Sequence, residues 1–310
     1  MNRNVVVSAL MLMFSVHSAV AQKTITGFSE VSITEGDSKL IDGVERTQPD
    51  IYYVPLSDGT YRAMRLTVKP GEPARMTVPY IYMTTSHSVC VSWKSSADDA
   101  GSVVRYGSDE SNLNASVVSD SKRIAGTYYW NSALIDNLEP DAVYYYRVEG
   151  KGGTSATYRF RTMPLPGSMD KIRVLLIGDH QRNERSDYEW MLNAARKTVA
   201  EKYGDAPFED NIRFIMNVGD QVDAGRSELY ESVHLFKSRS VSPSLPTMTA
   251  VGNHEYREDS ELSRYKGHYR YDTLSYAGIS SGTASYYAYQ VGRTLFVVLD
   301  SDDPSAAQKM

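Results

Sequence analysis

The chain contains a single cysteine, Cys90, among its 310 residues. One cysteine cannot form an internal disulfide, so the fold must be stabilised by its packed cores. In the run SVCVSW, Val89, Val91 and Trp93 alternate with Cys90, which predicts a strand with Cys90 on the opposite face. The neighbouring residues give no support to a metal-binding or nucleophilic thiol. We expect Cys90 to be a small packed residue and Trp93 to fill a core.

The chain also lacks an excess of positive charge and an apolar run long enough to cross a membrane. Its 33 Lys and Arg residues are outnumbered by 38 Asp and Glu residues, with a net charge of −5, so no nucleic-acid partner is expected. The apolar run 5–16 is shorter than the ~20 residues of a membrane span, so we expect no stable membrane anchor. With Arg3 before it and small residues after it, this run predicts a signal peptide over 1–21. The protein should therefore be exported, either secreted or periplasmic.

Turn signals divide the rest of the chain into units, as expected for a length that exceeds one hydrophobic core. Residues 22–73 consist of short alternating runs between turn dipeptides, which predicts a β-rich lead-in segment. Residues 74–163 contain candidate strands at the spacing of a β-sandwich. Within them, LEPDAVY (138–144) resembles the Leu-x-Pro-x-x-x-Tyr motif of fibronectin type III domains. That resemblance implies a tyrosine corner at Tyr144.

From residue 170 to 310 the pattern changes to strands that alternate with helices. Repeated strand–helix–strand units favour a largely parallel sheet with helices packed on it. A helix is predicted from Ser186, a candidate N-cap, to a stop at Gly204. Its apolar face, at helical spacing, consists of Tyr188, Met191, Leu192, Ala195 and Val199.

Two further elements are predicted in this region. A second helix should cover 227–238, with Leu229, Val233 and Phe236 on one face, and His234 in it reads as a surface residue. The run SYYAYQVGRTLFVVLDS predicts a hairpin that turns at Gly292.

Three motifs carry most of the functional information: VLLIGDHQ (174–181), FIMNVGDQVDAG (214–225) and TAVGNHEY (249–256). In each, an apolar run typical of a buried parallel strand ends in glycine and a side chain able to bind metal. In α/β proteins the chemistry lies just beyond the carboxyl ends of the strands. Hard oxygen ligands repeated at that position predict a divalent metal site.

These motifs resemble those of the calcineurin-like metallophosphoesterases. The sequence contains Asp179-His180-Gln181, then Gly219-Asp220-Gln221-Val222-Asp223, then Gly252-Asn253-His254-Glu255, in the order of that family. Residues 74–163 resemble the amino-terminal domain of purple acid phosphatases, which precedes such motifs. The implied fold is a fibronectin type III-like β-sandwich followed by a partial α/β/β/α metallophosphoesterase domain over 170–310. We expect the domain to be incomplete, because the family's two later histidine elements do not occur before Met310.

The resemblance implies a centre of two metal ions, divalent or trivalent, with iron, zinc and manganese as the candidates. Asp220 would bridge the ions, and Asp179 and Gln181 would complete the first. Asn253 would bind the second through its amide oxygen. His254 would face the substrate as the catalytic histidine, because histidine is the side-chain type commonly used for proton transfer at neutral pH.

Other residues near the motifs have lesser roles. Gln181 stands where many relatives have histidine, and its amide oxygen is a weaker ligand than imidazole for a borderline metal. His180 should face away from the metal, since consecutive side chains of an extended segment point apart. Asp223 stands where purple acid phosphatases have their chromophoric tyrosine, so no purple colour is expected. It would either support the site from behind the ligands or cap the following helix. His268 precedes the LFVVLDS strand and is not expected to be a ligand.

The activity implied is hydrolysis of small-molecule phosphate esters by a metal-activated water, of the acid phosphatase-like monoesterase type. A phosphodiesterase is one alternative. The other is an exported, non-enzymatic binding protein with a vestigial phosphoesterase domain. The second metal would retain only Asp220 and Asn253, so we expect this chain to bind metal weakly and hydrolyse little. The oligomeric state is left open.

Overall fold

A computed structural model describes residues 24–34, 36–69, 76–96, 101–123, 128–151, 153–181 and 187–303. The expected signal peptide and the candidate N-cap Ser186 lie outside these residues. The chain divides into two compact units, residues 1–69 and 70–310. Over the described ranges, no helix is both long enough and apolar enough to cross a membrane.

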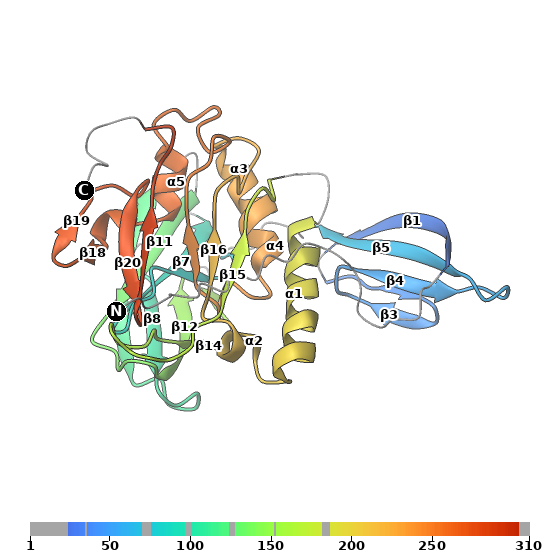
Figure 1. The fold of residues 1–310 in the computed structure, drawn as a ribbon, viewed down its shortest axis with the longest axis horizontal. Helices are drawn as coiled ribbons and strands as arrows, with labels where there is room; N and C mark the ends of the chain where they lie inside the picture. The colour runs from blue at the N-terminus through green and yellow to red at the C-terminus, as the bar shows by residue number, and fades with distance from the viewer. Residues whose placement is uncertain are drawn as a thin grey trace, which may run out of the picture. The chain divides into compact units, whose positions relative to one another are not determined.

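In residues 24–34 and 36–69, which the structure describes, the regular elements of the first unit are all strands (blue in Figure 1). Its three-stranded sheet has β5 in the centre, parallel to β1 and antiparallel to β4. The turn before β5 is held by Asp58, whose Oδ1 accepts the backbone N–H of Thr60 at 2.9 Å. A separate hairpin is formed by β2 and β3. The bounds are β1 Ile25–Thr34, β2 Lys39–Ile41, β3 Val44–Arg46, β4 Asp50–Pro55 and β5 Tyr61–Lys69.

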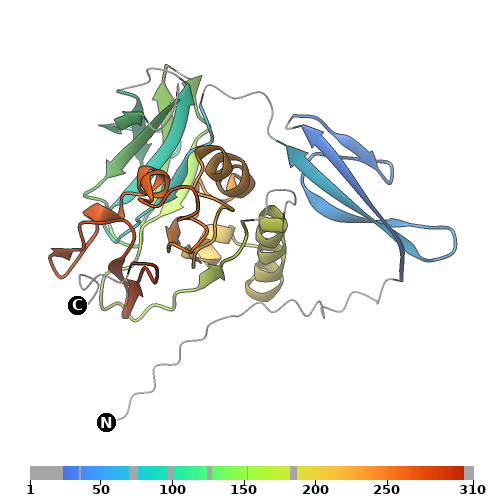
Figure 2. The ribbon, with the colours of Figure 1, turned by 90° about the horizontal axis from the view of Figure 1, so that it is seen from above.

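The second unit begins with a β-sandwich of two antiparallel sheets, coloured teal to green in Figure 2. One sheet has the order β10-β11-β7-β6, and the other has β13-β12-β8-β9 with β14 also paired to β12. The first sheet contains β6 Tyr80–Tyr82, β7 Val89–Ser96, β10 Asp120–Arg123 and β11 Tyr128–Ile135. The second contains β8 Val103–Gly107, β9 Ala115–Val118, β12 Val143–Gly150, β13 Gly153–Thr154 and β14 Tyr158–Arg161.

The core between the two sheets confirms two predictions. Trp93 is fully buried and packs in one cluster with Val91, Val148 and Phe160. The hydroxyl of Tyr144 accepts the backbone N–H of Glu139 at 2.9 Å, which is the bond of a tyrosine corner.

The other face of the first sheet is buried as well, against the second half of the chain. Cys90 lies on this face, opposite to Trp93 as predicted, and packs with Tyr80 and Tyr82. Tyr80 receives the indole N–H of Trp130 at 2.9 Å and donates its hydroxyl to the carbonyl of His268 at 2.7 Å. This sheet therefore packs on one face against the other sheet of the sandwich and on its other face against the α/β part.

The α/β part is built on three parallel strands in the order β15-β16-β17. Helix α1 packs on one face of this sheet (Figure 1), through the apolar residues predicted for it. It ends at Tyr203 and is followed by Gly204, whose φ of +94° permits the left-handed turn that stops the helix. The bounds are β15 Val174–Ile177, α1 Asp187–Tyr203, α2 Phe208–Asn211, β16 Phe214–Asn217 and β17 Thr247–Thr249.

The opposite face of the sheet is covered by the predicted hairpin, which turns through Gly292. Phe214 of β16 meets the rings of Tyr289 and Phe296 at 5.9 and 5.3 Å between centroids, both edge to face. Short elements precede the hairpin. The bounds are α5 Ser263–His268, η2 Tyr271–Thr273, β18 Ser275–Tyr276, β19 Ile279–Ser280, β20 Tyr287–Val291 and β21 Thr294–Val298.

The second predicted helix is present, but its middle is a π-helix. It consists of α3 (Ser227–Leu229), η1 (Tyr230–Leu235) and α4 (Phe236–Ser238). The prediction that His234 is a surface residue was wrong: its exposed fraction is 2%. The buried face of this element includes residues at spacings of three and four, namely Tyr230, Val233, His234, Lys237 and Ser238. An apolar pattern does not select this face, because three of its side chains are polar.

Candidate metal centre

The loops that follow the three parallel strands meet at one edge of the sheet. The backbone N–H of Asp179 donates to the carbonyl of Gly219 at 3.3 Å, and that of Ala250 donates to Asn217 at 2.7 Å. The loop after β16, which carries Asp220, therefore lies between the loops that follow β15 and β17.

Glycine permits this close approach. Gly219 has a φ of +109°, and a Cβ at this position would lie 2.8 Å from the backbone nitrogen of Gly252. A Cβ at Gly252 would overlap Oδ1 of Asp220. Asp179 and Asp220 themselves have φ values of +55° and +53°, a conformation that costs non-glycine residues about 1–3 kcal/mol. Strain of this kind persists only where the surrounding contacts hold it.

Asp220 is the centre of the site, with an exposed fraction of 8%. Its Oδ1 accepts the backbone N–H of His254 at 3.1 Å. Its Oδ2 lies 3.5 Å from Nε2 of Gln181 and 3.8 Å from Nε2 of His254. The side chains of Asp179 and Asn253 are exposed on the flanking loops. The structure thus brings Gln181 and His254 to Asp220, and places Asp179 and Asn253 beside them through the backbone.

The donor set fits a hard cation. Oε1 of Gln181 is buried and has no hydrogen-bond partner among the residues that the structure describes. An unpaired buried acceptor, in a side chain whose amide nitrogen lies next to the Asp220 carboxylate, is an unsatisfied position that a cation would fill. Within the described ranges, no three His, Cys, Asp or Glu side chains are grouped for metal binding. The candidate ligands are accordingly two carboxylates, Asp179 and Asp220, with the amides of Gln181 and Asn253.

Glu255 is a residue of the site whose role the sequence did not indicate. It is fully buried, and its carboxylate accepts the backbone N–H groups of Asp220 (3.0 Å), Gln221 (2.7 Å), Val222 (3.4 Å) and Gly252 (2.7 Å). Burial raises the pKa of Glu255 to about 7, although these donors favour the ionised form. The only sequence signal was its place in the third motif.

His254 is held by Asp223. Its Nδ1 lies 2.9 Å from the carbonyl oxygen of Asp223 and 3.2 Å from Oδ1 of the same residue. Both partners are acceptors, so Nδ1 carries the proton in the neutral ring and Nε2 is left bare toward Asp220. Asp223 does not cap the following helix, whose N-cap residue is Arg226.

The other histidines of the α/β part lie away from the candidate ligands. His180 points into the protein as expected, with its Nε2 3.0 Å from Nδ1 of His234. Burial lowers the pKa of both rings, to about 3 for His234. His268 is 1% exposed between Trp130 and Tyr230, and neither of its ring nitrogens has a hydrogen-bond partner among the described residues. It does not contact the site.

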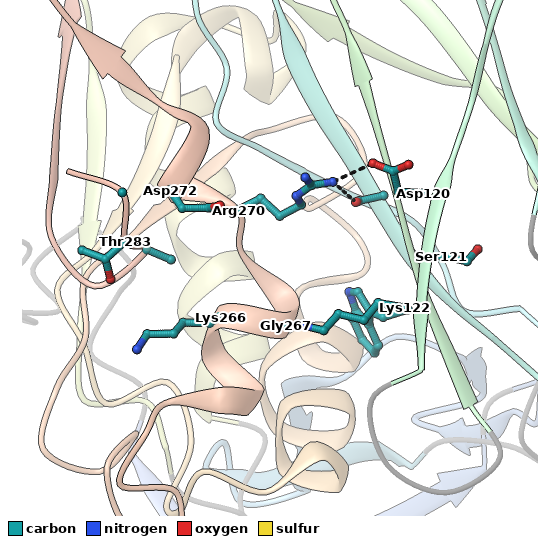
Figure 3. A pocket seen from close by; sticks show the side chains of 12 residues that line it. Asp120, Ser121, Lys122, Lys266, Gly267, Arg270, Asp272 and Thr283 are labelled. Carbon is teal, nitrogen blue, oxygen red and sulfur yellow. Dashed lines mark hydrogen bonds and ion pairs between the residues drawn. The ribbon is translucent and has the colours of Figure 1, made fainter. Parts of the chain in front are cut away.

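A pocket of about 630 Å³ lies elsewhere, between the sandwich and the α/β part (Figure 3). Arg270 crosses it to reach Asp120 at 2.9 Å, and Lys122 and Lys266 lie on its wall. None of the candidate ligands lines it. The chemistry is therefore placed at the strand ends, where the reactive groups converge, and not in this pocket.

Comparison with known proteins agrees with this architecture. Residues 77–162 match the family described as purple acid phosphatase, N-terminal domain, and residues 172–301 match calcineurin-like phosphoesterase. A phosphoenolpyruvate phosphatase from Allium cepa is 30% identical over 230 residues, which cover 70% of this chain and 44% of the relative.

Two solved structures share the fold. The purple acid phosphatase PPD1 from seeds of yellow lupin (Lupinus luteus) aligns with a TM-score of 0.58 at 18% identity, over 80% of this chain and 49% of that one. PhoD aligns with a TM-score of 0.53 at 14% identity, over 75% and 53%. The chain spans about half the length of these relatives. The expected fold class is confirmed: residues 172–301 form a calcineurin-like phosphoesterase domain, preceded by a domain of the kind found at the amino terminus of purple acid phosphatases.

Proposed function

We propose that the protein hydrolyses phosphoric monoesters with the help of metal ions held by Asp179, Gln181, Asp220 and Asn253. The observation that carries this proposal is the unpaired, buried Oε1 of Gln181, which lies in the side chain next to the Asp220 carboxylate. The family matches support a phosphoesterase. The name of the Allium cepa relative supports a small-molecule phosphate ester as the substrate.

The ligands are assigned as two sets that share Asp220. Asp179, Gln181 and Asp220 would hold one ion, and Asp220 with Asn253 the second. Bound metal ions about 3.5–4 Å apart lower the pKa of a water molecule and neutralise charge on the phosphoryl oxygens. Iron, zinc and manganese all remain candidates for the ions.

His254 is assigned to the substrate. Because Asp223 fixes the Nδ1 proton, Nε2 is the nitrogen that presents itself to the site. In its protonated form, Nε2–H donates to a phosphoryl oxygen or to the leaving oxygen of the ester. Asp223 keeps the ring in this orientation, and its carboxylate stabilises the protonated ring.

The remaining sequence-based assignments stay proposals. We retain a signal peptide over 1–21, export, and domains over 22–73, 74–163 and 170–310.

The proposal is tested by measuring Mn²⁺ binding and aryl phosphate hydrolysis side by side. Asp220→Ala should lose both, since it removes the shared ligand. His254→Ala should keep its bound metal while turnover falls about 10²–10⁴-fold, the usual contribution of a general acid. His87→Ala, which changes a histidine in a sandwich loop, is the matched control and should alter neither.

Each outcome has a separate meaning. An unchanged protein that binds no Mn²⁺ would overturn the metal assignment and favour a binding protein without catalysis. Normal metal binding by Asp220→Ala would show that other residues are the ligands.

A further inference from the structure

A buried chain of hydrogen bonds runs behind the candidate metal centre. Nε2 of His180 lies 3.0 Å from Nδ1 of His234, and Nε2 of His234 lies 2.8 Å from the hydroxyl of Tyr269. That hydroxyl donates to Oε1 of Gln221 at 3.2 Å, and Nε2 of Gln221 donates to the carbonyl of Ala250 at 3.1 Å. The four side chains have exposed fractions of 3% or less.

The bonds of this chain all run in one direction. Gln221 donates through its nitrogen to Ala250, so its oxygen accepts from Tyr269. The Tyr269 oxygen must then accept Nε2–H of His234, which leaves Nδ1 of that ring bare to accept Nε2–H of His180. Both imidazoles are therefore neutral rings protonated at Nε2. The remaining Nδ1 of His180 has no partner within the described part of the chain, as a bare nitrogen at the end of such a chain would.

This chain of hydrogen bonds includes a residue in or next to every loop that carries a candidate ligand. His180 lies between Asp179 and Gln181, and Gln221 directly follows Asp220. Ala250 directly follows β17 and begins the loop that carries Asn253. The two central residues, His234 and Tyr269, come from outside these loops. His234 lies in the π-helical turn η1, and such turns are frequent at functional sites.

We propose that His234 and Tyr269 are positioning residues, which fix the three ligand-bearing loops relative to one another and so set the affinity for metal. This inference rests on the proposed function. Asp179 and Asp220 have left-handed backbone conformations that persist only under restraint, and each has a neighbour anchored by the chain. Hydrogen-bond partners behind metal ligands commonly change metal affinity by about 10–100-fold.

The test compares Tyr269→Phe with Tyr82→Phe in the 310-residue chain. Tyr82 packs against Tyr269 at 5.4 Å between ring centroids, is fully buried, and has a hydroxyl without a hydrogen-bond partner among the described residues. Both changes remove one hydroxyl from the same aromatic cluster, but only Tyr269→Phe interrupts the chain of hydrogen bonds. Calorimetric titration with Mn²⁺ should show affinity at least about 10-fold weaker for Tyr269→Phe. Affinity should stay within about twofold of the unchanged chain for Tyr82→Phe.

Equal Mn²⁺ affinity in Tyr269→Phe and the unchanged chain would overturn the inference and leave the proposed function intact. An unchanged chain that binds no Mn²⁺ would overturn the proposed metal site, and the inference with it.

Two further measurements cover the case in which Tyr269→Phe does not fold. His234→Gln keeps one acceptor and one donor, whereas His234→Phe keeps the ring without either, so only the glutamine variant should retain Mn²⁺ affinity. Equal affinities in the two would contradict the role. In the unchanged protein, ¹⁵N NMR of the imidazole rings at neutral pH should show Nε2–H on both His180 and His234. A proton on Nδ1 of either ring would be incompatible with this chain of hydrogen bonds and would overturn the inference.

Discussion

The carboxylate of Glu255 holds the loop of Asp220. Its Oε2 accepts the backbone N–H of Asp220 at 3.0 Å and that of Gly252 at 2.7 Å, while its Oε1 accepts Gln221 at 2.7 Å. One buried side chain therefore joins the loops that follow β16 and β17 at the candidate site.

Replacement of Glu255 by Gln should destabilise the fold by about 1–3 kcal/mol, because an amide has one acceptor oxygen and leaves buried N–H groups unpaired. Mn²⁺ binding should weaken as well, since Asp220 loses its anchor. Urea unfolding and metal titration measure the two effects. Glu228→Gln is the control, with a 69% exposed side chain, and should stay within about 0.5 kcal/mol. A Glu255→Gln protein as stable as this control would contradict the anchoring role.

Replacement of Trp93 by Ala should cost about 3–5 kcal/mol, the range for emptying a large aromatic side chain from a core. Trp93 is fully buried between the two sheets. The free energy of unfolding in urea is the measurement, with Leu134→Ala on the adjacent strand as control, where the side chain is 44% exposed. A loss as small as that of the control would show that the sandwich core does not depend on Trp93.

Replacement of Tyr144 by Phe should cost about 0.5–1.5 kcal/mol, the usual net value of one hydrogen bond. The change removes only the hydroxyl that accepts the N–H of Glu139. Tyr145→Phe, on the other face of the same strand, should have a smaller effect. In thermal or urea unfolding, Tyr144→Phe should be less stable than Tyr145→Phe. The reverse order of stabilities would argue against the tyrosine corner.

Replacement of His268 by Leu should reduce the sensitivity of the fold to acid. Burial lowers the pKa of His268 well below 6.5, so below pH 6.5 the unfolded chain takes up a proton that the folded protein does not. Stability supplied by the neutral ring is therefore full above pH 6.5 and is lost as the pH falls, by about 1.4 kcal/mol per pH unit. Comparing unfolding free energies at pH 6 and pH 5 should show a shallower decline in the variant by about this amount. Parallel declines would show that His268 is protonated in the folded state. Glu255, with a raised pKa, acts in the opposite direction but equally in both proteins.

Much of the fold followed from local patterns. Alternation in SVCVSW placed Trp93 and Cys90 on opposite faces of one strand, and helical spacing selected the buried face of α1. Side-chain direction in a strand or an α-helix is set by backbone geometry, so the pattern alone determines it. The convergence of the strand-end loops could be predicted for the same reason, because parallel strands end at one edge.

His234 shows where local pattern fails. It is buried with Tyr230 and Lys237 on one face of the helical segment, and an apolar pattern does not select a face that carries polar side chains. Glu255 shows a second limit. Its four backbone partners include groups 33 to 35 positions away in the sequence, and no local feature of TAVGNHEY points to them.

The sequence by itself therefore determined the order of the elements, the faces that β7 and α1 bury, and the three loops that carry Asp179, Asp220 and Asn253. Only the tertiary structure decided what holds those loops. His180 meets His234 across 54 positions, and His234 meets Tyr269 across 35. A polar group removed from water must find a partner wherever the packed chain provides one. That partner depends on how the layers come together and not on the residues next to it in the sequence.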